Sequence, residues 1–353
     1  MQIVYVIFAC LMLLAVWRMW RRRHGVLEDK PDPRFDPAEG QPEAHEALTL
    51  LLQKDWFGLT RLYGRISPSD RYHLIESLSE LHRMPPPEAP ADADSVILTI
   101  VGGMLVFHGM STRGSGPATS VLKANAARMT ENLKTAARLL KEAATRNPGD
   151  STTLALLLRL ELVTTGDQAQ INNLVGRIQA SGEDNIFAAV NHLLANTPKW
   201  GGSTDGMWRV ANEWASEGPN AAWLAIPARA HAEEWHHAMV LAPPNSPERN
   251  AMIDLMQDEG FHRHVAKLDD MFWAALARGS ISGAEASLAH NSFAFLVHVF
   301  RIGDRARPHL ERIGPYIAHH PWNLMPTISN EPTRLLADLR QQYGLPALPP
   351  AAR

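Results

Sequence analysis

The chain has 353 residues, which is enough for one large or two ordinary domains with a sizeable core. Hydrophobic residues make up 45% and charged residues 20%, a composition that is typical of globular proteins and excludes a largely disordered chain. The formal net charge is −3, and four of the arginines lie in the first 24 residues, where there is no acid. The rest of the chain is therefore acidic and lacks the basic charge that nucleic-acid binding requires.

The N-terminal segment predicts a membrane anchor. Residues 1–17 contain no charged side chain, and as a helix they would span about 25 Å, close to the thickness of a bilayer core. Trp17 and Trp20 stand where interfacial aromatic residues belong, and Arg21–Arg23 favour the cytoplasmic side, with no signal-peptide cleavage site after them. We therefore expect a single-pass transmembrane helix and its arginine cluster in residues 1–23, with the N-terminus outside. The alternative is a buried apolar helix of the globular body.

Three proline-containing stretches divide the remainder of the chain. Residues 24–42 are rich in Pro, Asp and Glu, which predicts a disordered juxtamembrane linker. Consecutive prolines within 84–94 prevent a helix from crossing that segment, and residues 344–353 predict an extended tail. The helical domain is therefore expected over 43–343. The only cysteine, Cys10, lies in the predicted anchor, so no disulfide can form within the chain.

Between these stretches, apolar residues recur at intervals of three and four, which predicts helices. The longest is expected over 118–146, after Pro117 and before the turn sequence Asn-Pro-Gly-Asp at 147–150. Ser151 is expected to cap the helix that follows this turn. The other helices are expected near 43–56, 70–84, 152–165, 168–180, 184–195, 204–217, 228–242, 247–258, 261–278, 283–302, 304–319 and 331–343.

Residues 95–109 are the one segment that could be a strand, because β-branched residues stand at its start. Its length and its helical surroundings favour a buried helix that is weakened by Gly102 and Gly103. The sequence thus predicts an all-α fold, an α-solenoid of stacked helical hairpins. The junction at 140–160 is typical of tetratricopeptide-like units, although no regular repeat of about 34 residues recurs.

Four segments, in this order, resemble an uncharacterised bacterial family of tetratricopeptide-like helical proteins. They are MSTRGSGPATSV (110–121), similar to Trp-x-x-Arg-Gly-x-Gly; KWGGSTDGMW (199–208), similar to Lys-Trp-Gly-Gly-Ser; ARAHAEEW (228–235), similar to Ala-His-x-Glu-x-Trp; and IGPYIAHHPW (313–322), similar to a Gly followed by Pro-Trp. Met110 departs from the family's Trp. The resemblance implies an all-helical fold, marks Trp322 as a fold-determining or interaction residue, and implies no activity.

The segment ARAHAEEWHHAM (228–239) is the most conspicuous candidate site. Its Glu234-x-x-His237 and the later Glu259-x-x-His262 have the spacing of di-iron ligands in helical bundles. His231, Glu234 and His237 can also be read as a mononuclear metal set.

Helical geometry argues against a metal site in this segment. At about 100° per residue, Trp235 lies in an apolar stripe and His231 at the edge of that stripe. Glu233, Glu234 and His237 then lie toward the polar side, and His236 lies nearly 90° from the stripe. We therefore expect a packed Trp235, a partly buried His231, a solvated acidic and imidazole face, and no bound metal.

Two glycine-containing turns are further candidates for binding or for fold determination. Arg113, Gly114 and Gly116 precede a helix, where exposed backbone N–H groups could hold a small anion or a partner's carboxylate. The alternative is a tight connection in which Arg113 donates to nearby carbonyls. A dinucleotide-binding loop is not expected, because it would need a preceding strand and a third glycine.

The second of these turns comprises residues 200–203. Gly201 and Gly202 supply permissive dihedral angles, and Ser203 is an expected N-cap, with Asp205 in the first helical turn. Trp200 and Trp208 are expected to pack over the turn rather than to form a binding pocket.

The sequence favours binding over catalysis. It contains no G-x-S-x-G or H-E-x-x-H motif, no P-loop, and no cysteine outside the predicted anchor, and we expect no cofactor. The leading hypothesis is a scaffold at the bacterial inner membrane whose cytoplasmic helical body binds another protein and no nucleic acid. The alternatives are an enzyme with a site around His231 and Glu234, metal-dependent or otherwise, and a body that has no partner and only caps the anchor.

Overall fold

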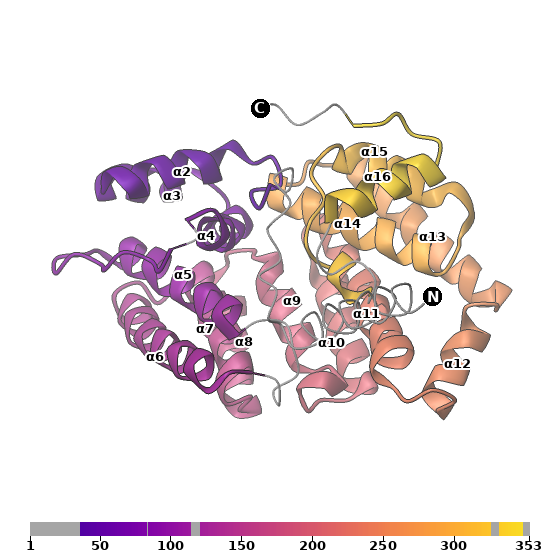
Figure 1. Ribbon diagram of the computed structural model, residues 1–353, viewed down its shortest axis with the longest axis horizontal. Coiled ribbons are helices and arrows are strands. Elements are labelled where there is room, and N and C mark those ends of the chain that lie inside the picture. The colour runs from indigo at the N-terminus through magenta and orange to yellow at the C-terminus, as the bar shows by residue number, and fades with distance from the viewer. Residues whose placement is uncertain (1–35, 83, 114–120, 326–331, 349–353) are drawn as a thin grey trace, which may run out of the picture.

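The computed structural model describes residues 36–82, 84–113, 121–325 and 332–348. Over these residues the fold is all-α, as the sequence predicts, and contains no strand. Figure 1 shows α2 to α8 on one side of the molecule, α12 to α16 on the other, and α9 to α11 between them. The helices are α2 (Pro42–Gln53), α3 (Trp56–Arg65), α4 (Pro68–His82), α5 (Ser95–Arg113), α6 (Lys123–Arg146), α7 (Ser151–Thr164), α8 (Gln168–Ser181), α9 (Ile186–Ala195), α10 (Thr204–Glu217), α11 (Ala225–His236), α12 (Pro247–Leu255), α13 (Glu259–Leu276), α14 (Gly283–Val299), α15 (Ala306–Ile313) and α16 (Pro332–Gln342).

The segment 95–109 is helical, which confirms the preferred interpretation, and its glycines have a packing role. A Cβ at Gly102 would come within 2.9 Å of the Leu140 side chain of α6. A Cβ at Gly103 would come within 2.6 Å of Ile75 in α4 and 2.8 Å of Leu156 in α7. The two glycines therefore let three neighbouring helices approach α5 closely.

The predicted anchor in residues 1–23 lies outside the described residues, as does the linker up to residue 35. Within the described residues, α5 alone is long and apolar enough to cross a membrane, and most of it is buried against neighbouring helices. Residues 36–41, expected to be part of the linker, are folded: Asp36 accepts hydrogen bonds from the backbone N–H groups of Ala38 and Gly40, and Ala38 is fully buried.

Helix α11 occupies the centre of the array and contacts α9, α10 and α14. In Figure 1 it lies between the two groups of helices. Every residue from Ala225 to Glu233 is buried, as are Trp235 and His236. A helix that is buried all round needs partners for its polar side chains, and in α11 these side chains meet inside the molecule.

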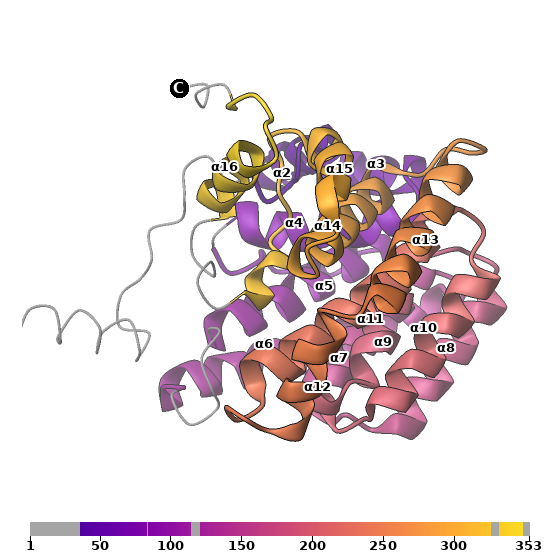
Figure 2. The ribbon, with the colours of Figure 1, turned by 90° about the vertical axis from the view of Figure 1, so that its right-hand side faces the viewer.

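Helix α4 joins the early helices to the late ones. It contacts α2, α5, α7 and α9, and also α14, beside which it lies in Figure 2. The backbone N–H of Ala284, at the start of α14, donates to Asp70 Oδ1 at 2.9 Å. Glu285 also accepts a hydrogen bond from Ser69, at 3.4 Å. The described helices therefore close back on themselves, and the N-terminal helices 43–82 pack on the rest of the array.

Several predicted boundaries were wrong in detail. The short helix α3 was not predicted; it contains two glycines, and Asp55 caps it by accepting from the Gly58 N–H. Asp150, not Ser151, caps α7 by accepting from the Thr152 N–H. Helix α15 ends at Ile313 instead of continuing to 319, because Gly314 adopts a positive φ of 62° and a proline follows it.

Candidate functional site

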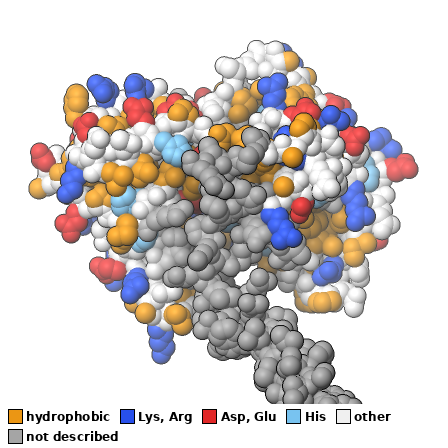
Figure 3. All heavy atoms as spheres, turned by 45° about the horizontal axis from the view of Figure 1, so that its top comes forward, with side chains coloured by type: hydrophobic (Ala, Val, Ile, Leu, Met, Phe, Trp, Pro, Cys, Tyr) orange, Lys and Arg blue, Asp and Glu red, His pale blue; other side chains and the backbone are white. Residues whose placement is uncertain are grey.

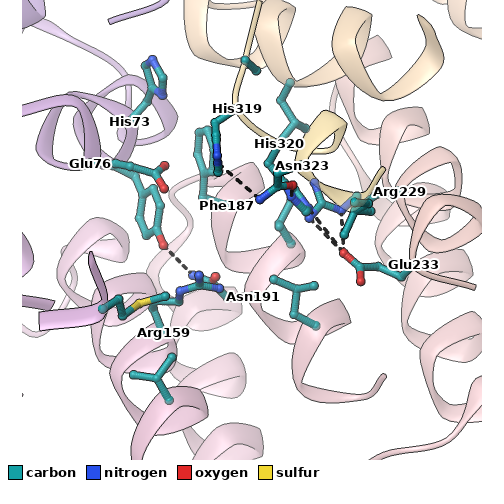
Figure 4. Close-up of a pocket in the computed structure, with 18 of the residues that line it drawn as sticks. His73, Glu76, Arg159, Phe187, Asn191, Arg229, Glu233, His319, His320 and Asn323 are labelled. Carbon is teal, nitrogen blue, oxygen red and sulfur yellow. Dashed lines mark hydrogen bonds and ion pairs between the residues drawn. The ribbon is translucent and has the colours of Figure 1, made fainter. Parts of the chain in front are cut away.

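A cleft of about 1010 Å³ lies between the two sides of the array. Its walls come from α4, α7, α9 and α11, and segment 318–324 crosses it from the C-terminal side (Figure 4). On the face in Figure 3, basic and acidic side chains are intermixed over the described surface, whereas the cleft gathers partly buried charges. Its polar lining consists of Glu39, Tyr72, His73, Glu76, Glu80, Arg113, Arg159, Asn191, Lys199, Trp200, Arg229, Glu233, His236, His319, His320 and Asn323.

The wall from α11 carries a buried ion pair. Arg229 donates from Nε and Nη2 to Oε1 of Glu233, at 3.2 and 3.0 Å, and the two residues are 3% and 6% exposed. Burial outweighs the attraction of Glu233 and lowers the pKa of Arg229 to about 10, so the guanidinium stays charged at neutral pH. His320 Nε2 lies 3.4 Å from the same carboxylate oxygen.

The expectation of a solvated polar face on this helix is therefore wrong for Glu233 and His236. Both side chains are buried, because α11 is surrounded by helices and by segment 318–324 instead of lying at the surface. Their polar groups face the cleft, where burial lowers the pKa of His236 and keeps its ring neutral.

The wall from α4, α7 and α9 is built around Tyr72. Its ring stacks on Phe187 with the centroids 4.8 Å apart, and its hydroxyl accepts a hydrogen bond from Asn191 Nδ2 at 3.0 Å. Asn191 Nδ2 also donates to the backbone oxygen of Ala155, at 3.2 Å, so both of its protons are used. Arg159 reaches the same wall, and its Nε is buried with no hydrogen-bond partner among the described residues.

Three glutamates form the acidic end of the cleft. Burial by the surrounding helices raises the pKa of Glu76, and the neighbouring Glu39 adds to the effect. Part of Glu80 is reached by solvent at the rim, but the enclosing walls and the carboxylates of Glu76 and Glu39 raise its pKa to about 7. Glu39 is held in place by the hydroxyl of Ser287 in α14.

His231 lies outside this cleft, in a closed aromatic cage. Its ring centroid is 4.4 Å from that of Trp208, 5.1 Å from Phe261 and 6.2 Å from Phe300. Neither ring nitrogen has a hydrogen-bond partner among the described residues, and the residue is 5% exposed. Burial, with His264 nearby, lowers the pKa of His231 to about 3, so the ring is neutral.

The other candidate ligands near His231 do not converge on it. Glu234 Oε2 is 4.0 Å from His231 Nδ1 and accepts a hydrogen bond from Trp208 Nε1. His237 begins a π-helical turn after α11, with its Nδ1 buried and unpartnered in the described part of the chain. No group of three His, Cys, Asp or Glu residues that could hold a metal ion is found in the described ranges.

The remaining sequence candidates separate into cleft and core residues. Arg113, the last residue of α5, lines the cleft, whereas Gly114 and Gly116 lie outside the described residues. Trp235 packs on Phe295, and the buried Trp322 donates from Nε1 to Asn291 Oδ1 at 2.8 Å.

The turn at 200–203 has the predicted local structure. Gly201 has a φ of 88°, and a Cβ at Gly202 would lie 2.2 Å from the backbone oxygen of Asn196, so glycine is required there. Ser203 caps α10, accepting from the Gly206 N–H, and Asp205 stands in the first turn. Trp200 lines the cleft with 38% exposure, whereas Trp208 packs on His231 rather than over the turn.

The sequence analysis did not identify the principal cleft residues, although some of them stand as charges inside otherwise apolar helical runs. Arg159 interrupts the apolar run LALLLRLEL (154–162), and Glu76 lies within HLIESLSEL (73–81). A charge inside an otherwise apolar helix is costly unless a partner or a water-filled cavity receives it. Which helices share that cavity depends on tertiary packing, and the sequence pattern does not contain this information.

Comparisons with known proteins find no matching family model, no similar curated protein and no similar solved structure. The resemblance to the tetratricopeptide-like family therefore stays a prediction.

Proposed function

We propose that this chain is a membrane-anchored protein whose helical body binds a segment of a partner protein in the central cleft. The anchor is the apolar segment in residues 1–23, which would hold the body on the cytoplasmic side of a bacterial inner membrane. The body would be a curved, solenoid-like array in which consecutive helices pack as tetratricopeptide-like hairpins, as α5 with α6 and α7 with α8 do.

The observation that carries this proposal is the charge inside the cleft. Among the described residues Arg159 has a buried nitrogen without a hydrogen-bond partner, and the carboxylates of Glu76 and Glu80 are partly withdrawn from water in an open cavity of about 1010 Å³. Such groups lower the stability of the unbound protein. A bound partner can supply the missing hydrogen bonds, so their presence in a cavity favours a binding role. A concave surface between helices is also where helical arrays hold extended peptides.

The alternative of an enzyme centred on His231 and Glu234 has no geometric support. The imidazole is enclosed by three aromatic rings and another histidine, and it does not line the cleft. A general base must come within hydrogen-bond reach of a substrate proton, and this ring is closed to substrates.

Site-specific photocrosslinking in intact cells tests the proposal. Leu241 lines the cleft and is 48% exposed, so a photoreactive p-benzoylphenylalanine in its place should form a covalent adduct with a partner protein, and the adduct should sediment with membranes. The matched control has p-benzoylphenylalanine in place of Phe57, which is 78% exposed on α3 and does not line the cleft. Absence of the adduct at position 241, or an equal yield at both positions, would exclude the cleft as the binding surface.

A further inference from the structure

Within the cleft, Arg159 stands out because no acid of the described part of the chain forms an ion pair with it. Its guanidinium influences the charge states of Tyr72, Glu76 and Arg229, which places it near all three. Figure 4 shows Arg159 with Asn191 and Glu76 on one side of the cleft, and Arg229 with Glu233 on the other. Asn191 has no amide proton left to donate to a ligand, because the Tyr72 hydroxyl and the Ala155 backbone oxygen already accept both.

The charges at the centre of the cleft leave room for one negative charge. Arg229 is neutralised by Glu233, to whose Oε1 it donates twice. Glu76 lies on the same side of the cleft as Arg159, and burial raises the pKa of its carboxyl group. Arg229 is thus paired with Glu233, whereas Arg159 has no acid within ion-pair distance among the described residues, so one guanidinium is left to meet a single negative charge.

Unused hydrogen-bond donors lie on both walls of the cleft. The Tyr72 hydroxyl accepts from Asn191 and keeps its own proton, since burial raises its pKa, and no acceptor for that proton is present among the described residues. Arg229 uses Nε and Nη2 on Glu233, so its Nη1 stays available. Arg159 contributes its buried Nε. Hydrogen bonds from charged donors to a carboxylate are about twice as strong as neutral ones.

We propose that Arg159, with the Tyr72 hydroxyl, binds the carboxylate of a partner peptide in this cleft. The inference rests on the proposed function, since it names the group by which the partner segment is held. A planar carboxylate matches the fork of an unpaired guanidinium. A phosphate dianion would carry more negative charge than the centre neutralises and would lie near Glu39, Glu76 and Glu80.

The test uses the full-length chain, purified in detergent and immobilised, and two pools of random acetylated hexapeptides that lack Asp and Glu. One pool ends in a free carboxylate and the other in an amide, and retained peptides are quantified by mass spectrometry. The carboxylate pool should be retained about tenfold better, since one charge-assisted hydrogen bond to a buried site contributes roughly that factor. The variant Arg159→Gln should lose this preference, and Tyr72→Phe should reduce it several-fold.

The matched control is Arg138→Gln on α6, whose side chain is 68% exposed and which does not line the cleft; it should keep the preference. Equal retention of both pools by the parent chain, or an unchanged preference in a folded Arg159→Gln variant, would overturn the proposal. Displacement of the peptides by inorganic phosphate at lower concentration than by acetate would assign the site to phosphate instead. If the parent chain retains both pools equally and yet forms the adduct at position 241, the cleft binds a partner by other contacts. If the adduct never forms, the proposed function itself fails.

Discussion

At the scale of single residues, His231 shows how a polar side chain can serve packing alone. Its ring contacts Trp208, Phe261 and Phe300, and neither nitrogen finds a hydrogen-bond partner among the described residues. A neutral imidazole can be buried at moderate cost, but an imidazolium in this cage would lose its hydration without compensation. The residue therefore makes the stability of the fold depend on pH.

We predict that His231→Phe flattens this dependence. The folded-state pKa of about 3 lies below the usual value, so the stability associated with the neutral ring is present above about pH 6.5 and is lost as the pH falls toward 3. Phenylalanine cannot be protonated. Between pH 7.5 and pH 4.5 the parent chain should lose about 2.5–3 kcal/mol more unfolding free energy than the variant, as measured by urea denaturation.

The same substitution at His45, which is 54% exposed on α2, serves as the control and should leave the slope unchanged. Parallel pH profiles for the parent chain and His231→Phe would show that the cage does not resist protonation.

Residue-level prediction succeeded where a local rule decides the outcome and failed where burial does. The helical wheel placed Trp235 correctly on the packed side of its helix, and Ser203 is the cap that its sequence context predicts; His231, expected at the edge of that side and partly buried, is only 5% exposed. The wheel placed Glu233 in solvent, but the side chain is buried and paired with Arg229. The wheel gives the direction of a side chain, whereas only the neighbouring elements determine whether that direction leads to water.

At the scale of elements, α5 shows that a low helix propensity can be a packing requirement. Gly102 and Gly103 weaken the isolated helix, yet they allow α4, α6 and α7 to approach its backbone. Periodicity identified nearly all of the helices. It missed α3, and it could not foresee what the glycines contact, because those contacts come from helices distant in sequence.

We predict that Gly103→Ala destabilises the fold by about 1–3 kcal/mol, because the added methyl group overlaps Ile75 and Leu156 in a filled core. Gly176→Ala on the exposed face of α8, where a Cβ would meet nothing within 4 Å, should instead stabilise by up to about 1 kcal/mol through helix propensity. Chemical denaturation of both variants measures the difference. Equal stabilities would mean that the interhelical space at Gly103 admits a methyl group.

At the scale of the whole molecule, the contact between α4 and α14 decides the shape of the cleft, since both helices contribute to its wall. The sequence predicted stacked hairpins but no closure between early and late helices. A pairing of segments more than two hundred residues apart leaves no periodic trace, because Asp70 and Ala284 each have ordinary local roles at the start of a helix.

We predict that Asp70→Ala loosens this closure. The carboxylate accepts from the Ala284 N–H and from the Ser67 hydroxyl, so its removal should cost about 1–3 kcal/mol of unfolding free energy. Hydrogen exchange at the Ala284 amide should accelerate more than tenfold. Asp205→Ala, an exposed acid in the first turn of α10, should change stability by less than about 0.5 kcal/mol. Unchanged exchange at Ala284 would show that packing alone holds the two helices together.

The same contact has a consequence for biosynthesis. Asp70 and Ala284 are separated by 214 positions, and Ser69 and Glu285 by 216. At about 5–20 residues per second, a ribosome needs roughly 10–40 s to deliver the second partner after the first. During that interval the surface of α4 that later meets α14 has no cover, and the walls of the cleft are incomplete. A partner segment of the kind proposed above would find no complete cleft before α14 (Gly283–Val299) has emerged, and the first helices must remain soluble until then.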